Sequence, residues 1–468
     1  MDIGLHFLGA TKNVTGSRFL LKANGHSYLI DCGMHQERDL RSRDWNAFPI
    51  PPSSIDAVLI THAHLDHCGY IPKLVREGFR GPIYSTPATA EIMKISLLDS
   101  AHLQEQDAEH KKRRHEREGR KGKYPEVPLY NVEDAQNSFE QFQTVKYKEL
   151  LDLGNGVTAS YHDAGHILGS AMIAIDVRAD GESRRIIFSG DIGRWDMPIL
   201  RDPSTFDNAD YIVMESTYGN RTHGAVADIE NELKEVIDQT IEARGNIIVP
   251  SFAIERAQEV LYHMNNLLAE KRIPNVMVFL DSPMALKVTD VFRHHPELFD
   301  EETRELLASH TSPFDFPSLV PVESTDHSKA LNYLGGTGMI VAGSGMCTGG
   351  RVKHHLVNNI NRPESTILFV GYQANGTLGR QIVEGAEEVR IYREKYPVRA
   401  QIKQLQGFSA HADKNELLRW LSSIKNTPRK VFVVHGEEDS THDFAELIEK
   451  EHGWNVAIPE YREEIPLD

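Results

Sequence analysis

His62-Ala63-His64-Leu65-Asp66-His67 is a short segment that holds four potential metal ligands. The apolar run directly before it, Ala57 to Thr61, is typical of a buried strand. Because side chains alternate along an extended chain, His62 and His64 can point into one cavity. Asp66 and His67 then follow around a turn. Imidazole nitrogen and carboxylate oxygen suit zinc, and also manganese or iron, but match calcium poorly. The segment therefore predicts ligands for two metal ions.

Further ligands are needed from elsewhere in the chain. Each tetrahedral zinc takes about four ligands, even when one group is shared between two ions. Three candidates follow predicted strands and stand beside glycines: His166, Asp191 and His435. Taken singly, each of them could instead do no more than cap a turn at the end of a strand.

Taken together, these residues resemble the metallo-β-lactamase fold and, more narrowly, the β-CASP nucleases. The order along the chain matches: Asp31 after an early strand, the histidine-rich segment, a later His, a later Asp and a final His. Three further segments resemble the β-CASP motifs: Glu215-Ser216-Thr217-Tyr218-Gly219, Phe408-Ser409-Ala410-His411-Ala412-Asp413 and Val434-His435-Gly436-Glu437. The resemblance extends over nearly the whole chain. It points to the branch that contains the cleavage-and-polyadenylation endonuclease and its bacterial and archaeal RNase relatives.

The resemblance implies an α/β fold, a four-layer αβ/βα sandwich with an inserted β-CASP domain on a mostly parallel sheet. The residues themselves support the insertion, because strand and helix patterns alternate after Gly219 as they do in βαβ units. We expect a metallo-β-lactamase domain over residues 1–219, a β-CASP domain over 220–404, and a return to the first domain over 405–468.

The resemblance also implies roles for the ligand residues. One Zn²⁺ would be held by His62, His64 and His166, the other by Asp66, His67 and His435, with Asp191 between them. Asp31 would orient a ligand histidine or the reacting water, and with Asp66 it belongs to the predicted catalytic set. Metal coordination lowers the pKa of water to about 7 and so supplies a nucleophile.

The leaving oxygen of a cleaved phosphodiester also needs a proton. His411 is the predicted general acid, because the neighbouring carboxylate of Glu215 could keep it protonated and oriented. A core or capping histidine is the alternative. Ser409 could donate a hydrogen bond to the scissile phosphate, or it could only satisfy the backbone.

Three junctions between strand and helix in the inserted domain are rich in glycine or small residues. They lie at Pro250 to Arg256, at Gly343 to Arg351 and at Gly371 to Arg380. Backbone N–H groups at such junctions can bind an anion, although tight turning explains them equally well. We predict substrate-binding roles for Ser251, Arg256, Ser344 and Arg351. None of the junctions has the Walker pattern, so no nucleotide cofactor is expected.

Composition limits the remaining possibilities. The 468 residues carry 51 basic and 68 acidic side chains, a formal net charge of −17 that by itself disfavours a polyanionic partner. One basic run, Lys111 to Lys123, concentrates positive charge, either as a solvated helix or as a nonspecific nucleic-acid contact. Three cysteines and no apolar stretch long enough for a bilayer predict a cytoplasmic protein without a membrane partner.

The sequence therefore predicts a zinc-dependent ribonuclease that cleaves single-stranded RNA, as an endonuclease, a 5′-exonuclease or both. A DNA-directed β-CASP nuclease, a hydrolase of small lactams or thioesters, and a scaffold subunit without catalysis are the alternatives. Scaffold relatives have lost metal ligands, whereas every expected ligand is present here. Homo-oligomers or RNA-processing partners are compatible with all of these.

Overall fold

The computed structural model describes residues 2–37, 39–120, 126–223, 229–308, 312–405 and 407–468. They form two compact units. The first comprises Met1–Trp195, Asp202–Thr222 and His411–Asp468, and the second comprises Asp196–Arg201 and His223–Ala410. The domain limits predicted from the sequence stay a prediction. Within the described ranges, no helix is both long and apolar enough to cross a membrane.

Two mixed sheets build the described part of the first unit. The first has the order β22 (Glu464–Pro466), β1 (Ile3–Phe7), β2 (Phe19–Ala23), β3 (His26–Ile30), β4 (Ala57–Leu59), β5 (Ile83–Ser85) and β6 (Phe142–Thr144). The second has the order β21 (Val456–Ala457), β20 (Lys430–Val434), β11 (Tyr211–Glu215), β10 (Glu182–Phe188), β9 (Ala171–Ala179), β8 (Val157–Asp163) and β7 (Leu150–Gly154).

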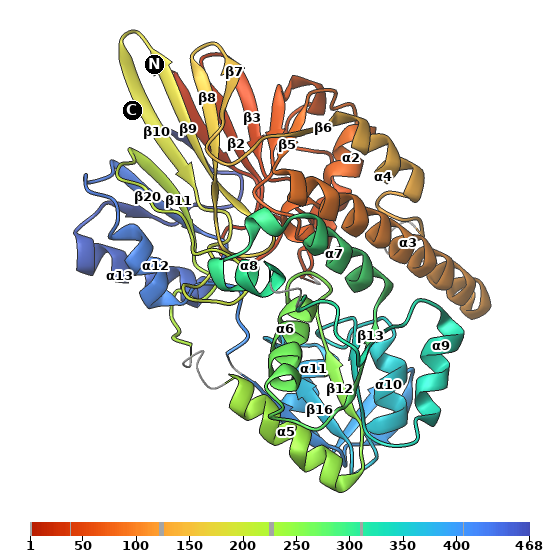
Figure 1. Cartoon of the computed structure of the whole chain (residues 1–468). Helices are drawn as coiled ribbons and strands as arrows, with labels where there is room; N and C mark the ends of the chain where they lie inside the picture. The colour runs from red at the N-terminus through yellow and green to blue at the C-terminus, as the bar shows by residue number, and fades with distance from the viewer. Residues whose placement is uncertain (1, 38, 121–125, 224–228, 309–311, 406) are drawn as a thin grey trace. The chain divides into compact units, whose positions relative to one another are not determined.

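The sheets face one another across an apolar core. Alternate residues of their strands are buried there, among them Phe7, Phe19, Phe188 and Phe432. On the outer side of the second sheet, α12 (Lys414–Leu421) and α13 (Glu438–His452) bury apolar side chains such as Trp420. The outer side of the first sheet is covered by α2 (Ile71–Arg76), α3 (Pro87–Glu118) and α4 (Val132–Ser138), as Figure 1 shows. These layers confirm the predicted αβ/βα sandwich.

The second unit is built on a parallel sheet, as the alternation of strand and helix patterns predicted. Its order is β14 (Leu319–Pro321), β13 (Met277–Asp281), β15 (Gly338–Ala342), β12 (Ile247–Pro250), β16 (Thr366–Phe369) and β19 (Gln401–Gln404). Helices α5 (Ile229–Ala243) and α6 (Arg256–Ala269) share an apolar cluster with one face of this sheet. Helices α10 (Val352–Asn359) and α11 (Leu378–Val383) share a cluster with the other face.

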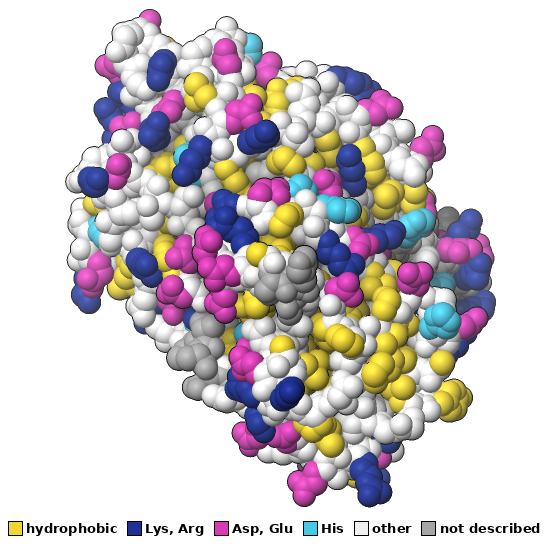
Figure 2. Space-filling view, in the orientation of Figure 1, with side chains coloured by type: hydrophobic (Ala, Val, Ile, Leu, Met, Phe, Trp, Pro, Cys, Tyr) yellow, Lys and Arg dark blue, Asp and Glu magenta, His cyan; other side chains and the backbone are white. Residues whose placement is uncertain are grey.

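Further α-helices and one hairpin complete the described part of the two units. They are the short helix α1 (Leu65–Cys68), the helices α7 (Pro283–His294), α8 (Glu301–Ala308) and α9 (Thr325–Ala330), and the hairpin of β17 (Glu388–Ile391) and β18 (Glu394–Pro397). The predicted basic run occupies the end of α3, where Figure 2 shows basic and acidic side chains interspersed. Its residues 121–123 lie outside the described ranges.

Candidate metal centre

The histidine-rich segment lies at the carboxyl end of β4. His62 and His64 follow the strand in a loop, whereas Asp66 and His67 lie on the one-turn helix α1 instead of a simple turn. The main-chain N–H groups of His67 and Cys68 both donate to His64 O at 2.9 Å, which closes the helix directly after the two loop histidines. One loop and one helical turn therefore supply four side chains to the same end of the sheet.

Asp31 fixes one of these side chains. It follows β3, the strand paired with β4, and its Oδ1 accepts the main-chain N–H of Thr61 at 2.8 Å. Its Oδ2 is 2.7 Å from Nδ1 of His67. Because Nδ1 is thereby occupied, Nε2 of His67 is the nitrogen left for another partner. The Thr61 hydroxyl also lies 3.0 Å from Nδ1 of His62 and orients that ring in the same way.

His166 and Asp191 lie on two loops that touch through their backbones. His166 follows β8, Asp191 follows β10, and the N–H of Gly193 donates to Ala164 O at 2.8 Å. A Cβ atom on Gly193 would lie only 1.7 Å from Gly165 O. Glycine is therefore required for the two loops to approach this closely.

The first group of side chains consists of His62, His64, His166 and Asp191. Nε2 of His62 is 3.1 Å from Nδ1 of His64, and Nε2 of His166 is 3.3 Å from the same Nδ1. Oδ2 of Asp191 lies 3.4 Å from Nε2 of His62 and 3.6 Å from Nε2 of His166.

The second group consists of Asp66, His67 and His435. Nε2 of His435 is 3.0 Å from Nε2 of His67 and 3.7 Å from Oδ2 of Asp66. The other carboxylate oxygen of Asp191, Oδ1, is 3.4 Å from Nε2 of His67. Asp191 thus presents one oxygen to each group.

These separations fit metal coordination. Ligand atoms about 2.0–2.1 Å from a tetrahedral zinc lie about 3.3–3.4 Å from one another, close to the distances in both groups. Asp191 Oδ1 is buried and has no hydrogen-bond partner among the described residues, although two imidazoles face it. A cation would satisfy this oxygen. The His and Asp donors suit zinc, and the residues present therefore fit the metal that the fold implies.

The pKa shifts suit ligand roles for His62, His64 and the two carboxylates, whereas at His67 and His435 burial would lower the pKa but Asp191 and the neighbouring carboxylates raise it, so metal binding there would displace a proton. Burial lowers the pKa of His62 well below its ordinary value and that of His64 to about 4, so both imidazoles are neutral. Burial alone would raise the pKa of Asp191, but the surrounding histidines, His435 first, lower it well below its usual range. Burial alone would also raise the pKa of Asp66, but the contact of Asp66 with His435 lowers this pKa to about 2. Neutral imidazoles and ionised carboxylates are the forms that bind metals.

His411 and Glu215 lie beside the first group. Nδ1 of His411 is 3.3 Å from Oε2 of Glu215 and 3.9 Å from Oδ2 of Asp191. Burial would lower the pKa of His411, but the carboxylate of Glu215 outweighs it and raises the pKa above the ordinary value. The other oxygen of Glu215 accepts the N–H of Ile192 at 2.6 Å, which holds the carboxylate in place. The side chain of His411 is 22% exposed, so it can meet a substrate.

The predicted substrate residues belong to the second unit, and most of them have partners within it. Ser251 is buried and donates to Phe252 O at 3.0 Å, while the buried guanidinium of Arg256 pairs with Glu259. The hydroxyl of Ser344 accepts the N–H groups of Thr348 and Gly349, which closes the glycine-rich turn. These contacts support the turn-forming interpretation of the junctions as much as the substrate-binding one.

Arg351 is engaged in the same way. Its guanidinium binds Oδ1 of the buried Asp281 at 2.6 Å and donates to the carbonyls of Val322 and Glu323. His355 binds the other oxygen of Asp281 at 2.6 Å. Arg351 therefore anchors the glycine-rich loop to β13. Ser409 is partly buried, and its N–H donates to Gly407 O at 3.0 Å.

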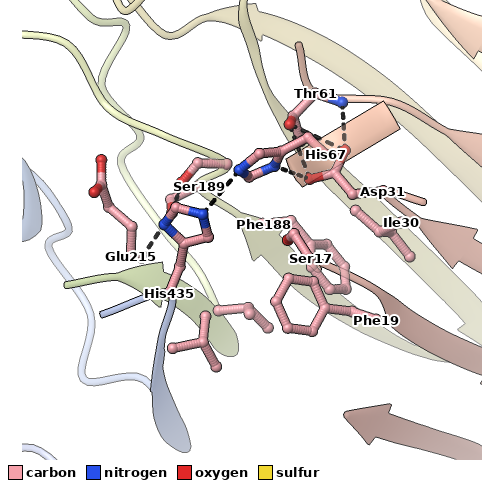
Figure 3. Close-up of a pocket in the computed structure, with 13 residues that line it drawn as sticks. Ser17, Phe19, Ile30, Asp31, Thr61, His67, Phe188, Ser189, Glu215 and His435 are labelled. Carbon is pink, nitrogen blue, oxygen red and sulfur yellow. Dashed lines mark hydrogen bonds and ion pairs between the residues drawn. The ribbon is translucent and has the colours of Figure 1, made fainter. Parts of the chain in front are cut away.

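A small pocket lies beneath the ligand histidines and is drawn in Figure 3. Asp31, Thr61, His67 and His435 line it together with Phe19 and Phe188 from the sheets and Ser17 from the loop before β2. Thr61 and Thr217 were not predicted as site residues, yet the Thr61 hydroxyl contacts His62 and the Thr217 hydroxyl is 3.2 Å from Nδ1 of His435. Thr61 directly precedes the histidine-rich segment, and Thr217 lies within the motif that begins at Glu215. Their position next to predicted site residues was the signal that could have identified them.

Three family models match the chain. Residues 20–208 match a metallo-beta-lactamase superfamily domain, residues 257–382 a Beta-Casp domain, and residues 395–459 a Zn-dependent metallo-hydrolase RNA specificity domain. The first match contains the histidine-rich segment, His166 and Asp191, and the third contains His411 and His435.

Several known proteins are similar to the chain. Ribonuclease TTHA0252 of Thermus thermophilus is 38% identical over 459 residues, which cover 98% of this chain and 99% of that protein. An RNase J-like protein of Methanocaldococcus jannaschii is 31% identical and covers 95% of each chain. Transcription termination factor FttA of Methanosarcina mazei is 32% identical over 95% of this chain and 68% of its own length. A crystal structure of an Enterococcus faecalis V583 protein of unknown function shares the fold, with a TM-score of 0.57 and 11% identity.

Proposed function

Because the chain belongs to the β-CASP family of metallo-β-lactamase-fold hydrolases, we propose that it is a zinc-dependent ribonuclease acting on single-stranded RNA. The family-model matches and the 38% identical relative confirm the family that the sequence motifs indicated. The products would be 5′-phosphate and 3′-hydroxyl ends. One observation carries the proposal: seven predicted ligands converge in two groups that share Asp191, with His411 and Glu215 beside them.

We assign one zinc to His62, His64 and His166, and a second zinc to Asp66, His67 and His435. Asp191 presents Oδ2 to the first group and Oδ1 to the second, which supports its assignment as the shared ligand. Zinc bound there would lower the pKa of a coordinated water to about 7 and polarise the scissile phosphate. Manganese or iron could occupy the same donors.

The protein's own groups would perform the remaining steps. Asp31 holds His67 in the tautomer and orientation that a ligand needs, through the 2.7 Å contact with Nδ1. His411, kept protonated by Glu215, would donate a proton to the leaving 3′ oxygen from its exposed edge. Glu215 is in turn fixed by the N–H of Ile192, so the pair needs no rearrangement before the proton is transferred.

RNA is the substrate favoured by the comparisons. One matched model is described as an RNA specificity domain, and two similar proteins are named as a ribonuclease and as RNase J-like. The match over residues 257–382 to a Beta-Casp domain disfavours hydrolysis of small lactams or thioesters. The full ligand set disfavours a purely structural subunit. DNA cleavage is the remaining enzymatic alternative.

The proposal is tested by zinc analysis combined with substrate profiling. We expect about two zinc ions per purified chain, cleavage of labelled single-stranded RNA that chelation stops and zinc restores, and slower or absent cleavage of the matching DNA. Protein without bound metal would indicate a scaffold, and equal cleavage of DNA and RNA would replace the ribonuclease with a general nuclease. Mapping the products on 5′-phosphorylated and 5′-triphosphorylated RNA would separate endonuclease from 5′-exonuclease action.

A further inference from the structure

Phe252 is a large apolar side chain on the surface of the second unit. It follows β12 at the carboxyl edge of the parallel sheet, and 41% of it is exposed to solvent. Single exposed apolar side chains are common and require no function by themselves. The surroundings of this phenylalanine are what make it unusual.

Two neighbouring loops leave Phe252 uncovered because they carry glycines beside it. A Cβ atom on Gly345 would lie 2.8 Å from Cδ2 and 2.9 Å from Cε2 of the ring. A Cβ atom on Gly371 would be 4.0 Å from the same Cε2. Gly345 follows β15 and Gly371 follows β16, the two strands that pair with β12. One ring edge therefore lies against the Gly345 backbone, and no side chain from either glycine covers the ring.

A buried side chain holds these two loops in place. Gln373 is 2% exposed, and its Nε2 donates to Gly345 O at 3.0 Å and to Gly371 O at 3.3 Å. The two glycine loops beside Phe252 are thus tied to each other by one amide. The N–H of Ala257, in the first turn of α6, donates to Phe252 O at 3.2 Å and fixes the backbone of the phenylalanine. The ring is consequently presented on a preorganised support.

The location is one where open parallel sheets bind ligands. Strands β12, β15 and β16 all end at the same edge, and the chain leaves β12 toward β13 on one side and later returns to β16 on the other. Crevices at such reversals of strand order are preferred binding sites. The guanidinium of Arg256 also lies near this loop, with its Nε 4.0 Å from the Cβ position of Gly371, but it is buried and paired with Glu259, so the ring itself is the surface offered to a ligand.

We propose that Phe252 is a stacking platform for a base of the single-stranded RNA substrate, a positioning role that rests on the proposed function. Phenylalanine has no polar atom, so the contact would use its π face and would accept every base. A flat aromatic ring that is 41% exposed and held on a fixed backbone at the carboxyl edge of a parallel sheet matches the chemistry of an unpaired base. It would bind and position the strand without taking part in bond cleavage.

The test measures binding of oligonucleotides that carry 2-aminopurine at successive positions, in the His411→Ala background so that the RNA stays intact. At one position we expect quenching of the probe by stacking. Phe252→Ala should remove that quenching and raise Kd about 5- to 150-fold, the range for loss of one stacked base. Phe252→Leu should behave like Phe252→Ala, because it keeps apolar volume but lacks the π face. Phe252→Trp should retain binding and quenching.

Controls separate stacking from general damage. Tyr333→Ala removes an aromatic ring that is 88% exposed elsewhere in the same unit, and it should leave Kd unchanged. In the cleaving enzyme, Phe252→Ala should raise KM far more than it lowers kcat, with an unchanged unfolding temperature. If Phe252→Leu binds the RNA and quenches the probe as the wild type does, the proposal that Phe252 is a stacking platform is overturned. If quenching depends on Phe252 but the wild-type enzyme cleaves no RNA, the platform stands and the hydrolase proposal falls.

Discussion

Glu215 and His411 are 196 positions apart in the sequence, and their 3.3 Å contact joins two of the β-CASP motifs. At the residue scale, the contact with Glu215 distinguishes His411 from the neighbouring histidines that are candidate metal ligands. His62 and His64 are neutral because burial lowers their pKa, whereas His411 is favoured in its charged form by the Glu215 carboxylate. The first two can bind a metal, and the third can donate a proton.

Replacing the proposed acid should slow cleavage without removing zinc. We expect His411→Ala to lower kcat on RNA about 10²- to 10⁴-fold, the usual contribution of general acid catalysis, with zinc content unchanged. A substrate with sulfur in place of the 3′ bridging oxygen needs little protonation, so the variant should cleave it at nearly the wild-type rate. Loss of zinc from His411→Ala would reassign His411 as a ligand.

The charge of Glu215 should set the alkaline limit of activity. An acid catalyst must be protonated, so the rate falls as pH rises through the pKa of His411. Burial opposes protonation and Glu215 raises this pKa, so Glu215→Gln should lower it and shift the alkaline limb of the pH–rate profile to lower pH. A profile of kcat/KM against pH measures the shift. An alkaline limb at the same pH in both proteins would show that another group titrates there.

The convergence of the candidate ligands could be predicted because their residue types and order are specific. Supporting groups could not, since Thr61 and Thr217 act through hydroxyl contacts of 3.0 and 3.2 Å that only the folded backbone determines. Arg351 illustrates the converse. A guanidinium in a glycine-rich loop suggests phosphate binding, yet here it also pairs with Asp281, a partner 70 positions away.

At the scale of elements, the candidate ligands follow the carboxyl ends of strands or, for Asp66 and His67, lie on the one-turn helix α1 that comes next, and close contacts between loop backbones bring these segments together. The loops after β8 and β10 meet at Gly165 and Gly193. Asp31 and His435 both have positive φ, 59° and 50°, an uncommon conformation that stores strain at a site. The chain therefore maintains unfavourable local backbone in order to aim these side chains.

A methyl group on Gly193 should disturb this junction. Its Cβ would lie 1.7 Å from Gly165 O, so Gly193→Ala must move the loop of His166 away from that of Asp191. We expect zinc content to fall and the free energy of unfolding to drop by roughly 1–3 kcal/mol, as for other overpacked sites. Gly335→Ala is the matched control, because nothing lies within 4 Å of its Cβ position. Full zinc content and wild-type stability in Gly193→Ala would contradict the claim that the two loops need glycine at position 193.

The long elements could be predicted closely from periodicity. The helical spacing of residues 229–243 in the sequence coincides with α5, and the helical pattern from Pro87 to about Gly119 matches α3. Short elements were less predictable. The turn expected at Asp66 and His67 is helical, and β22 pairs with β1 across almost the entire sequence, a pairing that no local pattern encodes.

At the scale of the whole molecule, the net charge of −17 stands against a substrate that is itself a polyanion. Acidic and basic side chains are intermixed on the surface that Figure 2 shows, so this surface is not uniformly positive. Several of the acidic residues, Asp66 and Asp191 among them, lie in the candidate metal centre. Two bound Zn²⁺ would supply positive charge where the phosphate must bind.

Removing the metal should therefore weaken RNA binding. We expect chelated protein to bind single-stranded RNA weakly, because few phosphate contacts remain, and with an affinity that still falls as salt increases. Protein with zinc in the candidate metal centre should bind the RNA more tightly than the chelated protein does at the same ionic strength. Filter binding over a salt series measures both states, and equally tight binding by the chelated protein would contradict this view of the charge.

Asp191 links the two halves of the candidate metal centre, because its two oxygens face the two ligand groups. The direct measurement is the rate at which wild-type protein and Asp191→Ala, purified in parallel, cleave a 5′-labelled single-stranded RNA in the presence of zinc. We predict cleavage by the wild type and background rates, at least about 10²-fold lower, for Asp191→Ala. Cleavage by Asp191→Ala at the wild-type rate would contradict the central claim that this metal centre is the ribonuclease site.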